Sequence, residues 1–251
     1  MTLPTGSGEV EAVLFDLDDV LVPFHTPGAW QWAWKPQGPI LGERRVGAAI
    51  RRALKAWDRR RWEGLTGRAP PADLEALHQH LTETLWAIAG HPLPDEETQA
   101  VVRRVLKPAH EIERYPDVPP LLERLRAAGI RPWVATPLPI ESARWLLHRA
   151  GLPEAMVGVA GDPPGPVVPD RRAFRVAADQ LGLKPERIAY VGDLFWSDVR
   201  AAARAGHPAV LLDRRDAWPK VQSGRILSLD GFESALAAGG TSGADDPEHD
   251  A

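Results

Sequence analysis

The segment Val13-Leu14-Phe15-Asp16-Leu17-Asp18 places two carboxylates, two positions apart, where a short apolar run ends. Such a run is typical of a strand buried inside a parallel sheet. Because side chains alternate along a strand, we expect Asp16 and Asp18 on the same side, whereas Asp19 faces the opposite way and suits a turn or cap. Open α/β sheets bind ligands at the carboxyl ends of their strands, so the pair indicates cation-assisted acid–base chemistry. Acidic residues that only end a strand would give the same local pattern.

Two further polar sites follow apolar runs later in the chain. The run Ile188–Val191 ends in a glycine and Asp193, and Asp198 comes shortly afterwards, before a helical segment. Between the two acidic sites, the run Pro132–Ala135 ends at Thr136. Each has a simpler explanation, because acids favour turns and helix N-termini and Thr is common where strands end. Their order along the chain is more specific than any one of them.

The order of an Asp-x-Asp motif, a strand-end Thr and a Gly-Asp-x-x-x-x-Asp motif resembles the haloacid dehalogenase-like (HAD) hydrolase superfamily. The resemblance extends from about Glu9 to Leu212. It implies a Rossmann-like, doubly wound parallel sheet with an inserted α-helical cap domain. The dehalogenase branch lacks a carboxylate at the position of Asp18, so the chain is similar to the phosphatase branch. The resemblance therefore implies a Mg²⁺-dependent phosphatase, a phosphoric monoester hydrolase.

The resemblance also implies a role for each motif residue. Asp16 would be the nucleophile that forms an aspartyl-phosphate. Asp18 would be the general acid toward the leaving alcohol and the general base toward the hydrolytic water. Thr136 would hydrogen-bond the transferring phosphoryl oxygens. The implied Mg²⁺ ligands are oxygens of Asp16, Asp18 (through its backbone carbonyl), Asp193 and Asp198, the last directly or through water.

One position departs from the family pattern. The family places a Lys before a Pro-Asp pair and a helix, and Val168 stands there in this chain. Such a cation offsets the charge of the nucleophile and the phosphate. Arg171 or Arg172 would be a substitute, although a guanidinium is bulkier than an ammonium and both residues also suit a solvated helix start. Two functions stay open: a phosphatase for a small phosphorylated metabolite, or a catalytically weakened or non-catalytic HAD-fold binding or regulatory protein.

The hydrophobic period changes after the first strand. From Glu43 to His110, three helical patterns follow one another without a strand between them, which does not fit an alternating βαβ sheet. We therefore predict a helical domain over residues 23–113, inserted into an α/β core formed by residues 9–22 and 114–237, and the resemblance implies that this insert is the helical cap domain. Residues 238–251 are rich in Gly and Ala and then acidic, and we expect a disordered tail there.

Tryptophan is unusually frequent, with 10 residues against 5 Phe and 2 Tyr. Six of them fall in the linker and the predicted cap: Trp30, Trp32, Trp34, Trp57, Trp62 and Trp86. They fit either core packing of the helices or a stacking platform for an aromatic or sugar substrate. Trp196, inside the second acidic motif, is a candidate for shaping the substrate entrance.

Composition limits the remaining possibilities. The 251 residues carry a net charge of −4, with 25% charged and 44% hydrophobic residues, which is ordinary for a soluble globular protein. No basic field is present to recruit nucleic acid or an anionic membrane, and the absence of Cys excludes disulfides and thiolate metal sites. The first nine residues lack the features of a signal peptide. We expect a cytoplasmic monomer or homodimer that acts on a small phosphorylated substrate.

Overall fold

The computed structural model describes residues 3–5, 8–23, 59, 114–136, 140–160 and 171–241. The chain groups into two compact units, Met1–Pro23 with Ile112–Ala251, and Phe24–Glu111. Apart from residue 59, the described residues belong to the first unit. The predicted helices of the cap and their tryptophans lie outside the described residues, and the cap stays a prediction.

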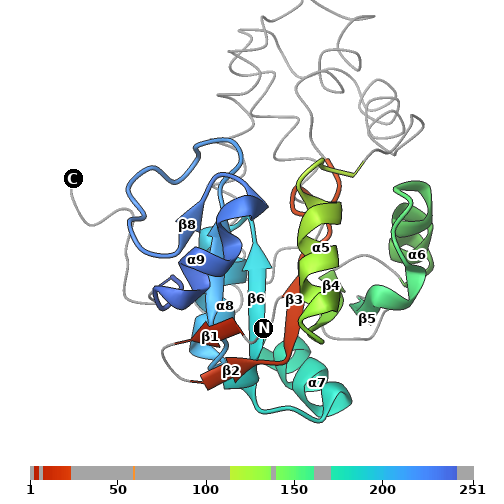
Figure 1. The fold of residues 1–251 in the computed structure, drawn as a ribbon, viewed down its shortest axis with the longest axis horizontal. Coiled ribbons are helices and arrows are strands. Elements are labelled where there is room, and N and C mark those ends of the chain that lie inside the picture. Colours follow the sequence, from red (N-terminus) through yellow and green to blue (C-terminus); the bar gives the residue numbers. More distant parts are fainter. Residues whose placement is uncertain are drawn as a thin grey trace, which may run out of the picture. The chain divides into compact units, whose positions relative to one another are not determined.

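A six-stranded parallel sheet forms the centre of the first unit (Figure 1). Its strands, in spatial order, are β5 (Val157–Ala160), β4 (Arg131–Thr136), β3 (Ala12–Phe15), β6 (Ile188–Gly192), β7 (Ala209–Leu212) and β8 (Arg225–Ile226). The chain adds β4 and β5 on one side of β3, and then adds β6, β7 and β8 on the other. The strand order therefore reverses between β3 and β6, where doubly wound sheets bind their ligands.

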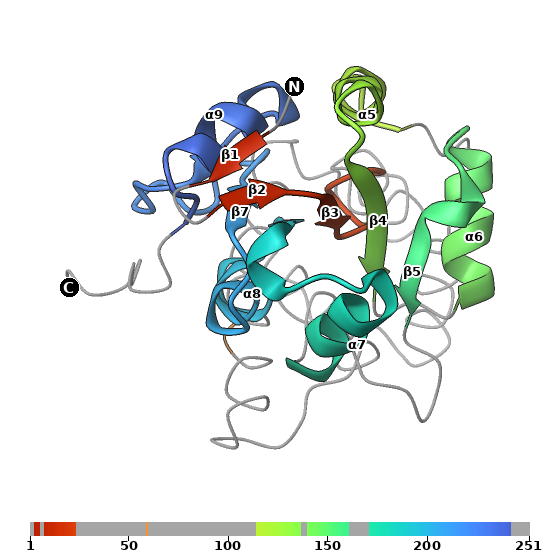
Figure 2. The ribbon, with the colours of Figure 1, turned by 60° about the horizontal axis from the view of Figure 1, so that its bottom comes forward.

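Helices cover both faces of the sheet, as the crossovers between parallel strands require. Figure 2 shows α5 (Val118–Ala127) and α9 (Phe232–Ala237) on one face, and α7 (Arg171–Leu181) and α8 (Arg200–Arg204) on the other. A further helix of the described residues, α6 (Ile140–Arg149), packs beside the edge strand β5. Three short 3₁₀ turns join these elements: Glu154–Met156, Pro185–Arg187 and Leu229–Gly231.

The central strands are buried on both faces. All residues of β3 and β7 are apolar and buried, and so are the first four residues of β6. In the parallel register, Leu14 of β3 pairs with Trp133 of β4 on one side and with Tyr190 of β6 on the other. Burying one such leucine contributes about 2 kcal/mol. This apolar packing fixes the register of the strands, and with it the positions of their carboxyl ends.

The predicted Rossmann-like, doubly wound core is confirmed. The apolar runs at residues 132–135 and 188–191 form β4 and β6, as expected. The last strand, β8, ends at Ile226, because Ser228 begins a 3₁₀ turn in which its Oγ accepts from Asp230 N at 3.1 Å. Three observed strands, β5 and the antiparallel pair β1 (Leu3–Thr5) and β2 (Gly8–Val10), are too short to show a period in the sequence.

The chain beyond α9 returns to the sheet. Thr241 is buried, and its N–H donates to Ala209 O at 2.6 Å. Within the predicted tail, Gly240 and Thr241 therefore lie beside β7, Ala238 and Gly239 are exposed, and 242–251 lie outside the described residues. Within the part of the chain that the structure describes, no helix is both long and apolar enough to cross a bilayer.

His207 is a buried titratable residue of this core. Its Nδ1 lies 2.9 Å from Ile188 O, and its ring centroid lies 5.2 Å from that of Phe174. Burial lowers the pKa of His207 because the charged form loses hydration, while the carbonyl of Ile188 acts in the opposite direction. The unfolded chain thus binds a proton at this histidine at a higher pH than the folded chain does.

Because the pKa is lowered on folding, the free energy of unfolding should fall as the pH drops below about 6.5. His207→Asn keeps a donor for Ile188 O but does not titrate, so it should flatten this slope. Urea unfolding of both proteins at about pH 7.5 and about pH 5.5 measures the difference. Identical slopes would show that His207 does not contribute to the pH dependence.

Candidate active site

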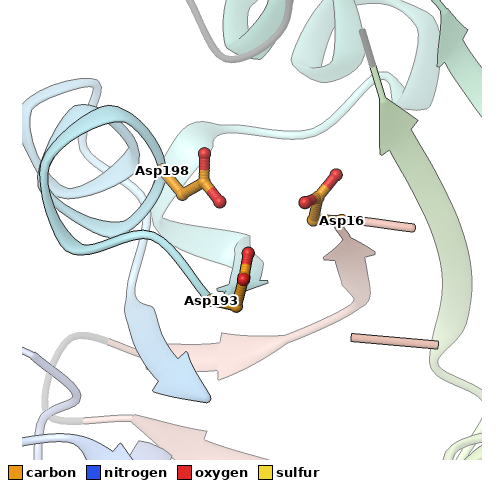
Figure 3. A group of neighbouring side chains, drawn as sticks. All are labelled: Asp16, Asp193 and Asp198. Carbon is orange, nitrogen blue, oxygen red and sulfur yellow. The ribbon is translucent and has the colours of Figure 1, made fainter. Parts of the chain in front are cut away.

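Three aspartates converge at the carboxyl ends of the central strands (Figure 3). Asp16 follows β3, Asp193 follows β6, and Asp198 lies in the turn that leads into α8. Asp16 N–H donates to Val191 O at 2.9 Å, which continues the pairing of the two strands to the site. One carboxylate oxygen from each aspartate lies within 4.8 Å of the other two. The structure thus brings together the three residues whose carboxylates were predicted to bind the metal.

The position before Asp193 has room only for a glycine, Gly192. A Cβ at Gly192 would lie 2.7 Å from Asp198 Cβ and 2.8 Å from Asp198 Oδ2, closer than real side chains approach. Residues Phe195–Val199 form one π-helical turn, a feature that is frequent at functional sites. Within it, the Asp198 carboxylate accepts from Leu194 N at 3.4 Å and from Ser197 Oγ at 3.3 Å. These contacts orient Asp198 toward the strand ends.

Negative charge accumulates in this largely buried cluster, in which Asp193 is half-buried. Asp16 and Asp198 are 9% and 1% exposed. Burial raises the pKa of Asp193 well above its ordinary value, and the charges of Asp19, Asp198 and Asp16 raise it further. Arg215 acts in the opposite direction. A divalent cation would relieve this repulsion.

The donor set fits Mg²⁺. The three side chains offer only carboxylate oxygens, which are the ligands that this hard cation prefers. Oxygen ligands of one Mg²⁺ ion lie roughly 3 to 4 Å apart. The spacing within 4.8 Å therefore suits a shared cation after a small contraction.

Asp18 lies apart from the cluster, in the turn that follows β3. Burial raises the pKa of its carboxyl to about 8, and the negative charge of Asp19 adds to the shift. Its Oδ1 is buried and has no hydrogen-bond partner among the described residues. A carboxyl with such a pKa is protonated at neutral pH and can donate its proton to a substrate oxygen. The metal role that the resemblance implies for Asp18 concerns its backbone carbonyl alone.

Thr136 ends β4, the strand beside β3. The pairing of Phe15 with Val134 places Thr136 at the same edge of the sheet as Asp16. Its side chain is buried, and the residues that follow, 137–139, lie outside the described part of the chain. Its contact with phosphoryl oxygens stays a prediction.

The third motif lies largely outside the described residues. Val168 falls in the segment 161–170, and Arg171 and Arg172 form the start of α7, where the backbone alone is described. The replacement of the missing Lys by one of these arginines stays a hypothesis.

Two tryptophans pack around the acidic loop. Trp218 Nε1 donates to Asp193 O at 3.3 Å. Trp196 is 8% exposed, lies edge-on to Phe195 with ring centroids 5.2 Å apart, and has the Arg200 guanidinium 4.7 Å from its ring centroid. These contacts pack Trp196 against its neighbours in the core, and its part in a substrate entrance stays a prediction.

Sequence reasoning missed a charged group beside Asp18. Asp19 does lie in a turn, as expected, but its carboxylate is also buried and pairs with Arg215 and Tyr115. Arg214 contacts the same turn. Both arginines follow the end of β7 after one intervening residue, Asp213, and this position near a strand end is the signal that would have indicated them.

The family follows from this architecture and from a sequence match. The family model described as "haloacid dehalogenase-like hydrolase" matches residues 10–206, a span that contains all the motifs above. The chain belongs to this family and is a hydrolase, so the predicted family and the prediction of an enzyme are confirmed.

Individual relatives agree with this assignment. The chain is 32% identical to a phosphoglycolate phosphatase of Rhodospirillum rubrum, over 89% of this chain and 88% of that protein. It is 29% identical to a glyceraldehyde 3-phosphate phosphatase of Methanopyrus kandleri, over 82% of this chain and 84% of that protein. The solved structure of L-2-haloacid dehalogenase from Xanthobacter autotrophicus is similar in fold, with a TM-score of 0.61, 20% identity, and coverage of 95% of this chain and 93% of that one.

Removal of one charge from the cluster should stabilise the metal-free protein and weaken its response to Mg²⁺. In chelator, Asp193→Asn should raise the melting temperature, because a neutral amide relieves the repulsion among buried carboxylates. Mg²⁺ at roughly 100 times its dissociation constant should stabilise the wild type by about 2.7 kcal/mol, and the variant by much less. Thermal unfolding with Mg²⁺ and with chelator measures both effects.

Glu123→Gln, which removes an exposed charge from α5, is the control and should behave as the wild type. A wild-type melting temperature that does not change with Mg²⁺ would argue against a metal site at these aspartates.

Proposed function

We propose that this hydrolase is a Mg²⁺-dependent phosphatase that cleaves small phosphomonoesters through an aspartyl-phosphate at Asp16. The observation that carries the proposal is the separation of four carboxylates into two environments. Asp16, Asp193 and Asp198 form a cluster that fits a divalent cation. Asp18 lies apart with a pKa of about 8, which suits a proton donor. A nucleophile beside a cation site and a separate acid are the groups that phosphoryl transfer to a carboxylate needs.

In the first step, an oxygen of the Asp16 carboxylate attacks phosphorus. The bond between Asp16 and phosphorus forms while the bond to the ester oxygen breaks. Asp18 gives its proton to that oxygen, which leaves as an alcohol. Thr136 donates its hydroxyl proton in a hydrogen bond to a phosphoryl oxygen. Bound Mg²⁺ supplies positive charge that offsets the repulsion between the nucleophile and the phosphate.

In the second step, the ionised Asp18 takes a proton from water as the water oxygen attacks phosphorus. The bond from phosphorus to Asp16 breaks, inorganic phosphate leaves, and both carboxyl groups return to their starting states. One ester and one water thus give one alcohol and one phosphate. A group that donates and then accepts a proton works best with a pKa near the working pH, and burial gives Asp18 such a value.

The relatives favour a short-chain metabolite as the substrate. The two phosphatase relatives are named for phosphoglycolate and glyceraldehyde 3-phosphate. Both compounds are small phosphomonoesters, and we propose the same class for this chain. These two compounds are the first to test.

A second function is favoured by one residue of the sequence. Val168, in place of the family Lys, removes a cation that would neutralise the phosphate, as expected in a weakened enzyme or a binding protein. The raised pKa of Asp18 favours the enzyme, because a binding protein has no need of a proton donor at this position. The phosphatase is therefore the preferred function.

Asp16→Asn should abolish phosphatase activity. An amide cannot attack phosphorus, so kcat for p-nitrophenyl phosphate and for phosphoglycolate should fall by about four orders of magnitude. Wild-type activity should disappear in chelator and return with Mg²⁺. Phosphate release measures all of these, with Glu123→Gln as the control.

Wild-type turnover in Asp16→Asn would exclude Asp16 as the nucleophile. No Mg²⁺-dependent activity of the wild type toward any phosphomonoester would instead support the binding protein.

A further inference from the structure

The turn that carries Asp18 is closed by its own backbone. Asp19 N–H donates to Val22 O at 2.8 Å, and Leu21 N–H donates to Leu17 O at 3.0 Å. Asp19 adopts a φ of +54°, in the left-handed region that is unfavourable for residues other than glycine. Such a residue keeps this conformation because its surroundings hold it.

The Asp19 side chain is held by two donors from distant parts of the chain. Its buried Oδ1 accepts from Arg215 Nη2 at 2.5 Å and from Tyr115 Oη at 3.1 Å. Arg215 follows β7, and Tyr115 precedes α5. The Arg215 side chain is 19% exposed and that of Asp19 is 8% exposed, so solvent screens this ion pair much less than a surface pair.

Arg214 holds the backbone of the same turn. Its guanidinium donates to Asp19 O at 3.2 Å and to Val20 O at 3.0 Å. It also forms a bidentate pair with Asp117, at 2.7 and 2.9 Å, and lies 3.9 Å from the ring centroid of Tyr115. The planar fork of an arginine makes these contacts at the same time, which the single ammonium of a lysine does not.

The Asp18 carboxyl has no comparable support, since its buried Oδ1 lacks a hydrogen-bond partner among the described residues. The backbone of the turn therefore sets its position. We infer that Arg215, acting through Asp19, and Arg214 position Asp18 for proton transfer to the leaving group. The inference rests on the proposed function, in which Asp18 is the general acid, and identifies both arginines as positioning residues.

Displacement of the general acid Asp18 should slow the reaction of those substrates whose leaving oxygen needs a proton. A misplacement of about 1 Å can cost roughly a hundredfold in rate. Phenyl phosphate releases a phenolate whose conjugate acid has a pKa of about 10, and this oxygen needs the proton. Dinitrophenyl phosphate releases a much weaker base that leaves without one. If Arg215 acted by its charge on the metal or the phosphate instead, its loss would slow both substrates alike.

The test compares kcat/KM for these two substrates at saturating Mg²⁺. In Arg215→Gln, we expect a loss of about a hundredfold with phenyl phosphate and of less than about threefold with dinitrophenyl phosphate. Asp18→Asn should show the same selective loss. The double variant should lose little more than Asp18→Asn alone, because an acid that is absent cannot be displaced.

Two milder variants extend the test, and they also serve if Arg215→Gln fails to fold. Arg215→Lys should recover most of the activity toward phenyl phosphate, because an ammonium can still donate to Asp19. Tyr115→Phe removes one donor to Asp19 and keeps the ring beside Arg214. It should lower kcat/KM for phenyl phosphate roughly fivefold and leave that for dinitrophenyl phosphate unchanged.

Arg225→Gln is the matched control. Arg225 pairs with Asp213 at 2.8 Å and is 17% exposed, close to the value for Arg215, but its partners Asp213 and Asp216 lie outside the Asp18 turn. Its loss should therefore not distinguish the two substrates.

Equal losses with both substrates in Arg215→Gln and Tyr115→Phe would overturn the positioning role. The proposed function would still stand in that case, provided that Asp18→Asn remained selective for phenyl phosphate. If Asp18→Asn were not selective either, the role of Asp18 as the general acid would fail, and the positioning role with it.

Discussion

Asp16, Asp193 and Asp198 repel one another at a buried edge of the sheet, and the parallel pairing of β3 with β6 holds the first two in place. The register of that pairing is fixed by strands that are apolar and buried on both faces. Burial contributes about 25 cal/mol per Å² of apolar surface, so a few well-packed strands can offset the repulsion of a small cluster. A divalent cation bound between the three carboxylates would attract each of them and so outweigh their mutual repulsion.

The same residue type has a different environment at three nearby positions. Asp16 belongs to the carboxylate cluster. Asp18 is half-buried and has a raised pKa, and Asp19 forms an ion pair with Arg215. In the proposed reaction these environments suit a nucleophile, a proton donor and a structural anchor. Environment distinguishes these roles, because the three side chains are chemically identical.

Much of the candidate site could be predicted because its residues follow local, periodic patterns of apolar residues in the sequence. Apolar runs that end in Asp16, Thr136 and Asp193 indicate parallel strands, and such strands place their carboxyl ends along one edge. The position of Asp18 has a different cause from the one expected. The strand β3 ends at Phe15, so Asp18 owes its place to the following turn and not to strand alternation. That turn depends on Arg214 and Arg215, nearly 200 residues further along the chain, and no local pattern shows such a pairing.

A crystal structure of the protein with Mg²⁺ and beryllium fluoride would test the proposed site most directly, because trifluoroberyllate mimics a phosphoryl group on a carboxylate. We expect metal density among the carboxylates of Asp16, Asp193 and Asp198, and the beryllium of the trifluoroberyllate group bonded to an oxygen of Asp16. The Asp18 carboxyl should lie on the side from which the leaving group departs. A metal bound elsewhere, or a trifluoroberyllate group that is not attached to Asp16, would contradict the proposed site.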